Sequence, residues 1–207
     1  MGPKPLILGF DTSAAHCAAA LLQGDVVLAE RFEAHTRGQA ERLMPLIEEI
    51  LTETGQSWSD LDAIGVGVGP GNFTGIRIAV SAARGLALGL EVPAIGVSGF
   101  DARARSGSLA AVPAPRGQVY AQLPGENAPR LMPETEAEDA ARSAGLSFAP
   151  EASPAGLAQQ IAKQACRRYL AHLETDTLTE IAPPAPLYLR AADAAPARDV
   201  PPQLIDG

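Results

Sequence analysis

The chain has 207 residues, which is enough for one large domain or two small lobes with a hydrophobic core. Hydrophobic residues make up 46% and charged residues 19%, which excludes disorder as the main state, and the aromatic share of 4% leaves the core to aliphatic side chains. The net charge of −8 repels phosphate backbones, so the chain would need a partner with a basic surface to act on RNA or DNA.

The N-terminal part of the chain alternates between strand and helix patterns. In chain order the expected elements follow the sequence β-β-β-α-β-α-β, at residues 6–10, 17–22, 26–32, 44–54, 63–68, 73–88 and 92–97. Gln23-Gly24-Asp25 is a tight hairpin turn in this antiparallel meander, and Pro45 must lie in the first turn of its helix or kink it. This order is the topology of a ribonuclease H-like half, and two such halves make the actin-like ATPase architecture.

The remaining chain carries weaker signals. A hairpin is expected around residues 113–117, and helices at 134–144 and 153–173, the second with Ser153 as its N-cap. Residues 187–190 predict a short last strand or extended segment. We therefore predict an α/β protein with the actin-like ATPase (ribonuclease H-like) fold in two lobes, the second one reduced. The predicted parts are an N-terminal lobe, a C-terminal lobe and a loosely packed Ala- and Pro-rich tail, at residues 1–100, 101–190 and 191–207.

The two helices of the N-terminal lobe are unusually apolar. The first repeats apolar residues at i, i+3, i+4 and i+7, which marks one buried face. The second has Gly75, Ala79, Ala83 and Ala87 at intervals of four residues, a strip of small side chains that lets another helix approach closely. A helix that is apolar on most of its circumference is either fully buried or meets another chain, and a two-layer domain leaves one side free. The sequence therefore favours a partner-binding surface made of Leu43, Leu46, Ile47, Ile50, Gly75, Ile76, Ala79, Val80 and Ala83.

Two short segments have the composition of phosphate-binding turns. Gly69 and Gly71 lie after an expected buried strand and at the start of a helix, where free N–H groups can hold an anion. The alternative is a tight strand-to-helix turn, because the stretch has neither the Walker A lysine nor the dinucleotide spacing. Asp11, Thr12 and Ser13 stand where actin-like ATPases place a phosphate-binding Asp, and they equally favour an Asx-type turn. These five residues are the candidates for a vestigial phosphate pocket.

The sequence predicts neither catalytic nor metal-binding residues. His16, His35 and His172 have no second ligand at metal spacing, and each is interpreted as a surface or turn residue. Cys17, in a strand, and Cys166, on the apolar face of a helix, are interpreted as core thiols in a reducing compartment. No signal peptide is visible, and no apolar run reaches the ~20 residues of a membrane span, so we predict a soluble cytoplasmic protein.

Three stretches resemble the bacterial TsaB (YeaZ) family: ILGFDTS near the start, GVGPGNFTGIRIAVSAARGLALG in the middle and PLYLR near the end. The likeness is strong over residues 6–100 and weak afterwards, apart from Arg116–Ala121 and Pro186–Arg190. It implies a half-degenerate actin-like ATPase that pairs with TsaD, a homologue that keeps the catalytic machinery, and acts with the small ATPase TsaE. Such a complex transfers a threonylcarbamoyl group to N6 of adenosine 37 in tRNA.

The resemblance also implies how the parts divide the work. The two proteins meet through their first two helices, here about residues 39–54 and 73–88, and the same helices form a homodimer when the partner is absent. ATP and threonylcarbamoyl-adenylate are used by the complex, and this chain has no cofactor of its own. The TsaD-like subunit holds the metal, and tRNA binds only through the complex. Pro113-Ala114-Pro115 replaces the family's Asp-Ala-Arg in the second hairpin, so the second phosphate-side Asp of the fold is missing.

Three functional hypotheses remain. The favoured one is a non-catalytic scaffold that binds and activates the TsaD-like enzyme. The alternatives are an autonomous actin-like ATPase or metallopeptidase, for which no metal motif is visible, and a self-associating interaction module. The scaffold hypothesis predicts that Ala79→Glu or Ala83→Arg abolishes partner binding and leaves the chain folded.

Overall fold

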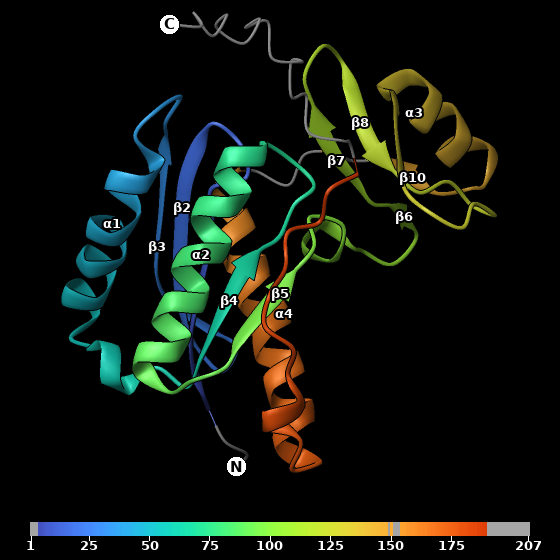
Figure 1. The fold of residues 1–207 in the computed structure, drawn as a ribbon. Helices are drawn as coiled ribbons and strands as arrows, with labels where there is room; N and C mark the ends of the chain where they lie inside the picture. The colour runs from blue at the N-terminus through green and yellow to red at the C-terminus, as the bar shows by residue number, and fades with distance from the viewer. Residues whose placement is uncertain (1–3, 149, 151–153, 190–207) are drawn as a thin grey trace, which may run out of the picture.

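The computed structural model describes residues 4–148, 150 and 154–189, and the statements below concern these residues. The expected N-cap at Ser153, the end of the PLYLR segment at Arg190 and the tail at residues 191–207 lie outside them. The described chain forms a five-stranded sheet with helices on both faces and a smaller unit of strands and one helix beside it (Figure 1).

The central sheet is mixed and has the strand order β3-β2-β1-β4-β5. Its strands are β1 (Leu6–Asp11), β2 (His16–Gln23), β3 (Val26–Ala34), β4 (Ala63–Gly67) and β5 (Ala94–Val97). β1, β2 and β3 pair antiparallel through short turns, whereas β4 runs parallel to β1, and β5 to β4, because a helix precedes each of them. The predicted order β-β-β-α-β-α-β is confirmed.

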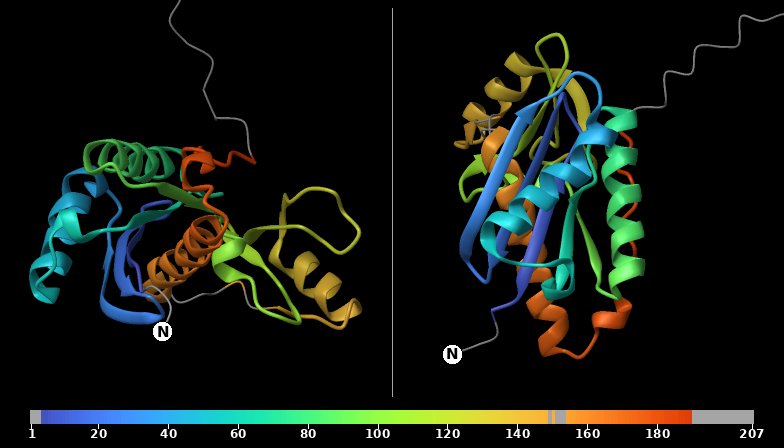
Figure 2. Two further views of the ribbon diagram at one scale, coloured as in Figure 1. Left: turned by 90° about the horizontal axis from the view of Figure 1, so that it is seen from below. Right: turned by 90° about the vertical axis from the view of Figure 1, so that its left-hand side faces the viewer.

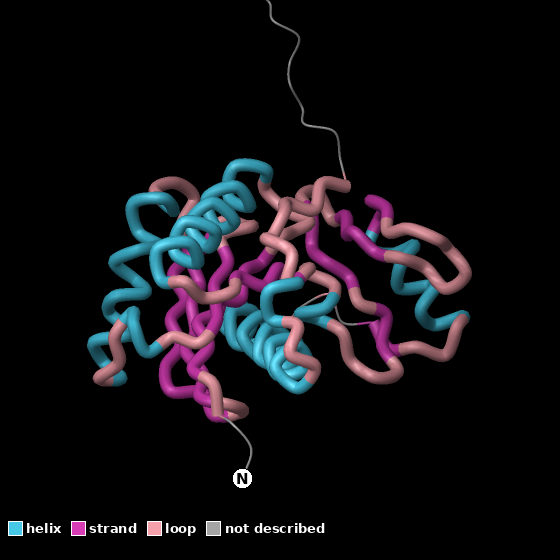
Figure 3. Tube along the Cα trace, turned by 60° about the horizontal axis from the view of Figure 1, so that its bottom comes forward, coloured by secondary structure: helices cyan, strands magenta, loops and turns pink. Residues whose placement is uncertain are grey.

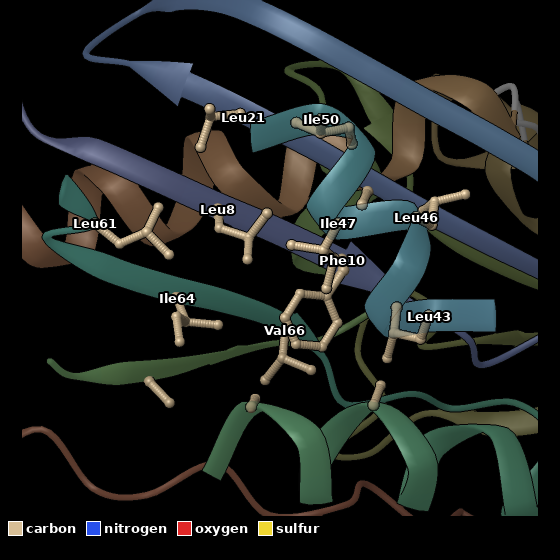
Figure 4. Close-up of a cluster of buried hydrophobic side chains, with 14 of the residues drawn as sticks. Leu8, Phe10, Leu21, Leu43, Leu46, Ile47, Ile50, Leu61, Ile64 and Val66 are labelled. Carbon is tan, nitrogen blue, oxygen red and sulfur yellow. The ribbon is translucent and has the colours of Figure 1, made fainter. Parts of the chain in front are cut away.

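Three helices enclose this sheet. They are α1 (Gln39–Thr54) and α2 (Phe73–Leu90) on one face and α4 (Pro154–Glu174) on the other (Figure 2). Under α1 and α2, Leu8 and Phe10 of β1 and Val66 of β4 meet the apolar side chains of α1 (Figure 4). Because both faces are covered, β1 and β4 are buried at every position and show no alternation between apolar and polar residues.

Helix α4 belongs to the first unit in space, although it follows the second unit in the chain. The sequence ends the N-terminal lobe at residue 100 and assigns α4 to the C-terminal lobe. In the structure, Ile161 of α4 lies in one hydrophobic cluster with Ile7 of β1. Gly9 lets the helix approach closely, because a Cβ there would lie 2.7 Å from the carbonyl oxygen of Ala158. The first unit therefore consists of two chain segments, a feature that local sequence patterns do not predict.

The second unit is small (Figure 3). Its elements are β6 (Ser108–Leu109), β7 (Ala111–Ala114), β8 (Gln118–Ala121), β9 (Arg130–Pro133), α3 (Glu134–Ser143) and β10 (Ser147–Phe148). β7, β8 and β9 form an antiparallel sheet, so the hairpin around residues 113–117 is confirmed, and β6 pairs in parallel with β10. Ala137 and Ala141 of α3 share a hydrophobic cluster with Val119 and Met132 of this sheet.

Helix α1 begins earlier than predicted and contains Pro45 in its interior. It starts after the left-handed Gly38 and ends at Gly55, which is also left-handed and is the predicted stop. Of the two alternatives that the sequence leaves open for Pro45, the first turn of the helix is therefore excluded. Pro45 lies on the exposed side of the helix, where the carbonyl oxygen of Glu41, which loses its helical partner, can reach water.

After α4 the chain crosses back over the sheet as an extended segment, residues 181–189, which we call the strap. The strap runs alongside α2 (Figures 1 and 2). The N–H of Leu187 donates to the carbonyl oxygen of Val68 at 2.8 Å, and the ring of Tyr188 stacks on that of Phe73 with centroids 4.9 Å apart. The sequence leaves a strand or an extended segment open for residues 187–190, and the described part is extended.

Helix α2 alone, among the helices of the described residues, is long and apolar enough to cross a membrane by length and composition. It has 18 residues, which stays below the ~20 residues expected of a membrane span. Here the helix lies on the central sheet, with Ile76, Ala79 and Ala83 buried in the core.

Candidate functional site

The apolar residues predicted to face a partner are buried in the chain's own core. Leu43, Leu46, Ile47 and Ile50 of α1 point toward the sheet around Phe10, and none of the four is more than 1% exposed (Figure 4). The predicted residues of α2 are buried in the same way, namely Gly75, Ile76, Ala79, Val80 and Ala83. The prediction is wrong for these side chains, because an apolar helical period marks the face that the fold buries, and here that face lies on the sheet.

The outer face of α2 presents a different set of residues. Those exposed to solvent are Thr74, Arg77, Ser81, Arg84, Gly85, Leu88 and Gly89. Leu88 is the large apolar side chain of this face, and it is 84% exposed. Ser81, Gly85 and Gly89 follow one another at intervals of four, and a Cβ added at either glycine would meet nothing within 4 Å. A free strip of small residues therefore exists, but on the side of α2 opposite to the predicted one.

The outer face of α1 is acidic. Its exposed glutamates are Glu41, Glu48, Glu49 and Glu53. Arg42 donates to Glu33 of β3 and to Glu49, the latter at 2.7 Å, and Arg31 of β3 pairs with Glu53. The guanidinium of Arg42 holds the pKa of Glu33 at about 2. Solvent-exposed pairs of this kind stabilise little, so their main effect is to tie α1 to the edge strand.

The turn between β1 and β2 lies beneath the first turns of both helices. The hydroxyl of Thr12 donates to the carbonyl oxygen of Gly75 in α2 at 2.6 Å. The side-chain amide of Gln39, the first residue of α1, donates to the carbonyl oxygen of Ala14 at 2.7 Å. The turn therefore holds the starts of α1 and α2 in a defined relative position.

The five residues of the predicted phosphate pocket come together at this turn, but their polar groups bind neighbouring protein groups. The N–H of Asn72 donates to the carbonyl oxygen of Ser13 at 2.6 Å. Gly71 lies so close to the same carbonyl group that a Cβ would not fit, and Gly69 has a left-handed φ of 96°. In this arrangement the glycines serve close packing, which is the strand-to-helix alternative that the sequence leaves open.

Asp11 is 2% exposed, and one oxygen of its carboxylate accepts three hydrogen bonds. Oδ1 accepts hydrogen bonds from the N–H of Ser13 at 2.9 Å, the hydroxyl of Ser13 at 2.8 Å and the ring of His16 at 2.8 Å. Burial alone would raise the pKa of Asp11, but the hydrogen bond and charge of His16, with the two bonds from Ser13, lower it below the ordinary value. Oδ2 lies so close to Gly67 that a Cβ added there would collide with it.

His16 and Arg103 are the residues near this turn that the sequence analysis misses. His16 is 6% exposed, so its interpretation as a surface or turn residue is wrong. It reaches Asp11 because β2 turns straight back along β1, which brings residues five apart into contact. Arg103 donates to the carbonyl oxygen of Gly99 at 3.1 Å; burial lowers the pKa of Arg103, and the charge of Asp11 opposes that shift.

The described residues contain no group of three or more His, Cys, Asp or Glu side chains that could hold a metal ion. His35 and His172 bind Glu33 at 3.0 Å and Thr177 at 2.8 Å. Cys17 and Cys166 are buried and unpaired, as predicted. Burial raises the pKa of the Cys17 thiol to about 11, which makes it a poor nucleophile at neutral pH.

Asp11→Asn tests the role of the buried carboxylate. The amide oxygen still accepts from Ser13 but loses its charge opposite His16, so we expect the free energy of unfolding at pH 7 to fall by about 1–3 kcal/mol. Because the pKa of Asp11 is lowered in the folded state, this stability is present above the unfolded pKa and is lost as the pH falls through the folded value. Urea unfolding across pH 7 to pH 2 should therefore show the two proteins converging at the acid end. A constant difference down to pH 2 would contradict the assignment.

Comparison with known proteins gives matches to part of the chain. A family model described as "TsaD: tRNA N6-adenosine threonylcarbamoyltransferase" matches residues 27–126. The tRNA threonylcarbamoyladenosine biosynthesis protein TsaB of Escherichia coli strain K12 is 42% identical over 122 residues, which cover 55% of this chain and 52% of the relative. The chain thus spans about half of the length of the curated TsaB proteins that it matches.

Two further matches cover most of the chain. An uncharacterized protein of Mycobacterium tuberculosis is 29% identical over 212 residues, with 92% of this chain and 94% of the relative covered. A crystal structure described as "an uncharacterized protein with similarity to peptidase YEAZ from Pseudomonas aeruginosa" superposes with a TM-score of 0.65 at 25% identity. It covers 90% of this chain and 100% of that chain. With the strand order of the central sheet, these matches agree with the predicted ribonuclease H-like, actin-like fold.

Proposed function

We propose, from the matches to TsaB and TsaD proteins, that the chain is a member of the TsaB (YeaZ) family and a non-catalytic subunit of a tRNA-modifying complex. In this proposal it binds and activates a TsaD-like enzyme. That enzyme transfers a threonylcarbamoyl group to N6 of adenosine 37 of tRNA. The reaction takes place in the cytoplasm, and the complex also contains a TsaE-like ATPase.

The observation that carries the proposal is the uncovered outer face of α2. Leu88 is 84% exposed there, beside the open small-residue positions Ser81, Gly85 and Gly89. Such a face gains free energy when another helix covers it, because apolar surface leaves water at ~25 cal/mol per Å² before the cost of association. The face therefore supports a partner helix on α2, in the helix that the family resemblance implies and on the side that the structure leaves free.

The chemistry of the complex is assigned to the partner. The N–H and the hydroxyl of Ser13, which could otherwise hold a phosphate, donate to Oδ1 of Asp11, and His16 binds the same oxygen. We therefore assign ATP, threonylcarbamoyl-adenylate and the metal to the other subunits, and no cofactor to this one. The net charge of −8 supports contact with tRNA only through the complex.

The rival enzymatic functions find less support. An autonomous actin-like ATPase needs an accessible carboxylate at the position of Asp11, and this carboxylate is buried, with Oδ1 bound to Ser13 and His16. A metallopeptidase needs a set of ligands, and the described part of the chain offers none of the required size. A homodimer through the same helices uses the same outer face and would compete with the TsaD-like partner.

Gly85→Trp tests the proposed face directly. The side chain enters open space in the isolated chain, so the variant should keep its melting temperature within a few degrees. Across a helix–helix contact the indole would force the partner away, and we expect binding to the TsaD protein of the same organism to weaken by about 100-fold or more. Co-purification and calorimetric titration measure the effect.

The control is Ala104→Trp, which places the same bulk at an exposed position near the second unit and should bind normally. Cells depleted of this chain should lose threonylcarbamoyladenosine from their tRNA, and only the control variant and the wild type should restore it. Unchanged levels after depletion would refute the proposed pathway.

A further inference from the structure

The outer faces of α1 and α2 carry opposite charge. Helix α2 contains Arg77 and Arg84 and no acidic residue, a net charge of +2. Helix α1 contains four glutamates and one arginine, a net charge of −3. Both helices lie on the same side of the central sheet (Figure 2). A chain with an overall charge of −8 thus presents one cationic helix next to an acidic one.

Contacts within the chain itself fix the side chain of Arg77. Its guanidinium lies 3.8 Å from the centroid of the Phe73 ring, and its Nε donates to the hydroxyl of Tyr188 at 2.9 Å. Tyr188 belongs to the strap, which Leu187 fixes by its bond to Val68, the residue that follows β4. The two terminal nitrogens of Arg77 have no acceptor among residues 4–148 and 154–189, so they stay available for a ligand.

Arg84 lies seven residues further along the same helix, two turns or about 10 Å away. It is exposed, and within the described chain it forms neither an ion pair nor a hydrogen bond. Val80 and Ser81 of α2 and Pro186 of the strap line, together with the two arginines, a hollow that is open to solvent. The hollow is thus a groove between α2 and the strap, with two arginines spaced along its α2 side.

We propose that the partner of the function proposed above lays an α-helix along this groove, with two carboxylates spaced two turns apart. One carboxylate pairs with the terminal nitrogens of Arg77 and the other with Arg84, while the apolar side of the helix covers Leu88. Cationic side chains of the same partner face the glutamates of α1. The inference rests on charge complementarity, which sets the partner's register and speeds association.

The strap is part of this recognition. The hydroxyl of Tyr188 fixes the direction of Arg77, so the arginine loses less rotamer freedom when the carboxylate binds. The PLYLR segment, which the family resemblance singles out, then acts through Arg77 and makes Tyr188 a positioning residue. Tyr188→Phe keeps the ring stack and removes only this bond.

The test is a titration of the TsaD protein with variants of the full chain. Arg77→Gln and Arg84→Gln should each weaken binding about 10-fold, and Tyr188→Phe about threefold. Wild-type affinity should fall steeply between 50 and 500 mM NaCl, and the slope should be shallower for each arginine variant. Arg105→Gln removes an exposed arginine outside α1 and α2 and should change neither affinity nor salt dependence. A Glu→Arg or Asp→Arg change on the facing TsaD helix should restore the binding of Arg84→Glu.

The outcomes separate the two proposals. If the wild-type chain does not bind TsaD at all, the proposed function fails. If it binds, but the arginine variants bind equally well at every salt concentration, the partner is not an acidic helix and this inference is overturned. The inference is also overturned if the variants change only the self-association of the chain, measured by sedimentation, because the groove then receives a second copy.

Discussion

Ala79→Glu is expected to unfold the chain rather than to separate it from a partner. Ala79 is 0% exposed and lies between α2 and the central sheet, so the new carboxylate would enter a core without a cation or a donor to receive it. Removing such a charge from water costs several kcal/mol, which is most of the stability of a typical domain. We expect a loss of at least about 3–5 kcal/mol, measured as the free energy of unfolding in urea.

The matched control is Ser81→Glu, two residues further along α2. Ser81 is exposed, so the same side chain remains in water and the stability should change by less than about 0.5 kcal/mol. Because Ser81 lines the groove between Arg77 and Arg84, this variant should still weaken binding to the TsaD-like partner. The result that would sink the structural assignment is an Ala79→Glu protein that folds normally and fails only to bind the partner.

Among the Gly→Ala substitutions in α2, Gly75→Ala is expected to lower the free energy of unfolding the most. The added Cβ would lie against the carbonyl oxygen of Thr12, closer than real Cβ contacts come, and that oxygen belongs to the backbone and cannot swing away. Relief requires the β1–β2 turn to move, which breaks the bond from the Thr12 hydroxyl to Gly75. We expect a cost of about 2–4 kcal/mol in chemical denaturation.

Gly85→Ala provides the control in the same helix. No atom lies within 4 Å of the added Cβ, so the change should stabilise α2 by about 0.5–1 kcal/mol through helix propensity alone. The two substitutions are chemically identical and differ only in what the methyl group meets. Equal effects at the two glycines would show that the turn does not pack on α2 as described.

The order of strands and helices follows from local patterns. The apolar runs of β1 and β4, the turn at Gly24 and the period of α1 are each contained within a few neighbouring residues, and each is confirmed. The Gly55 stop is predicted for the same reason, since only a residue that tolerates a left-handed φ suits that position. These features depend on the backbone preferences of short segments and need no knowledge of distant contacts.

The prediction that the apolar faces of α1 and α2 bind a partner was wrong, because helical periodicity does not show what covers an apolar face. The spacing of Leu43, Ile47 and Ile50 shows that they share one face of α1, but it does not say whether the sheet or another protein covers that face. The same limit applies to α2, where the buried strip at Ala79 and the exposed strip at Gly85 are equally small in the sequence.

The sequence by itself indicated a resemblance to one family and determined the fold class and the order of the elements in the central sheet, because these reside in motifs and in short-range periodicity. Only the tertiary structure decided that His16 meets Asp11, that α4 closes the far face of the sheet and that the strap brings Tyr188 to Arg77. Each of these contacts forms only when the elements pack together in the folded chain. Their distances therefore do not follow from the positions of the residues in the sequence.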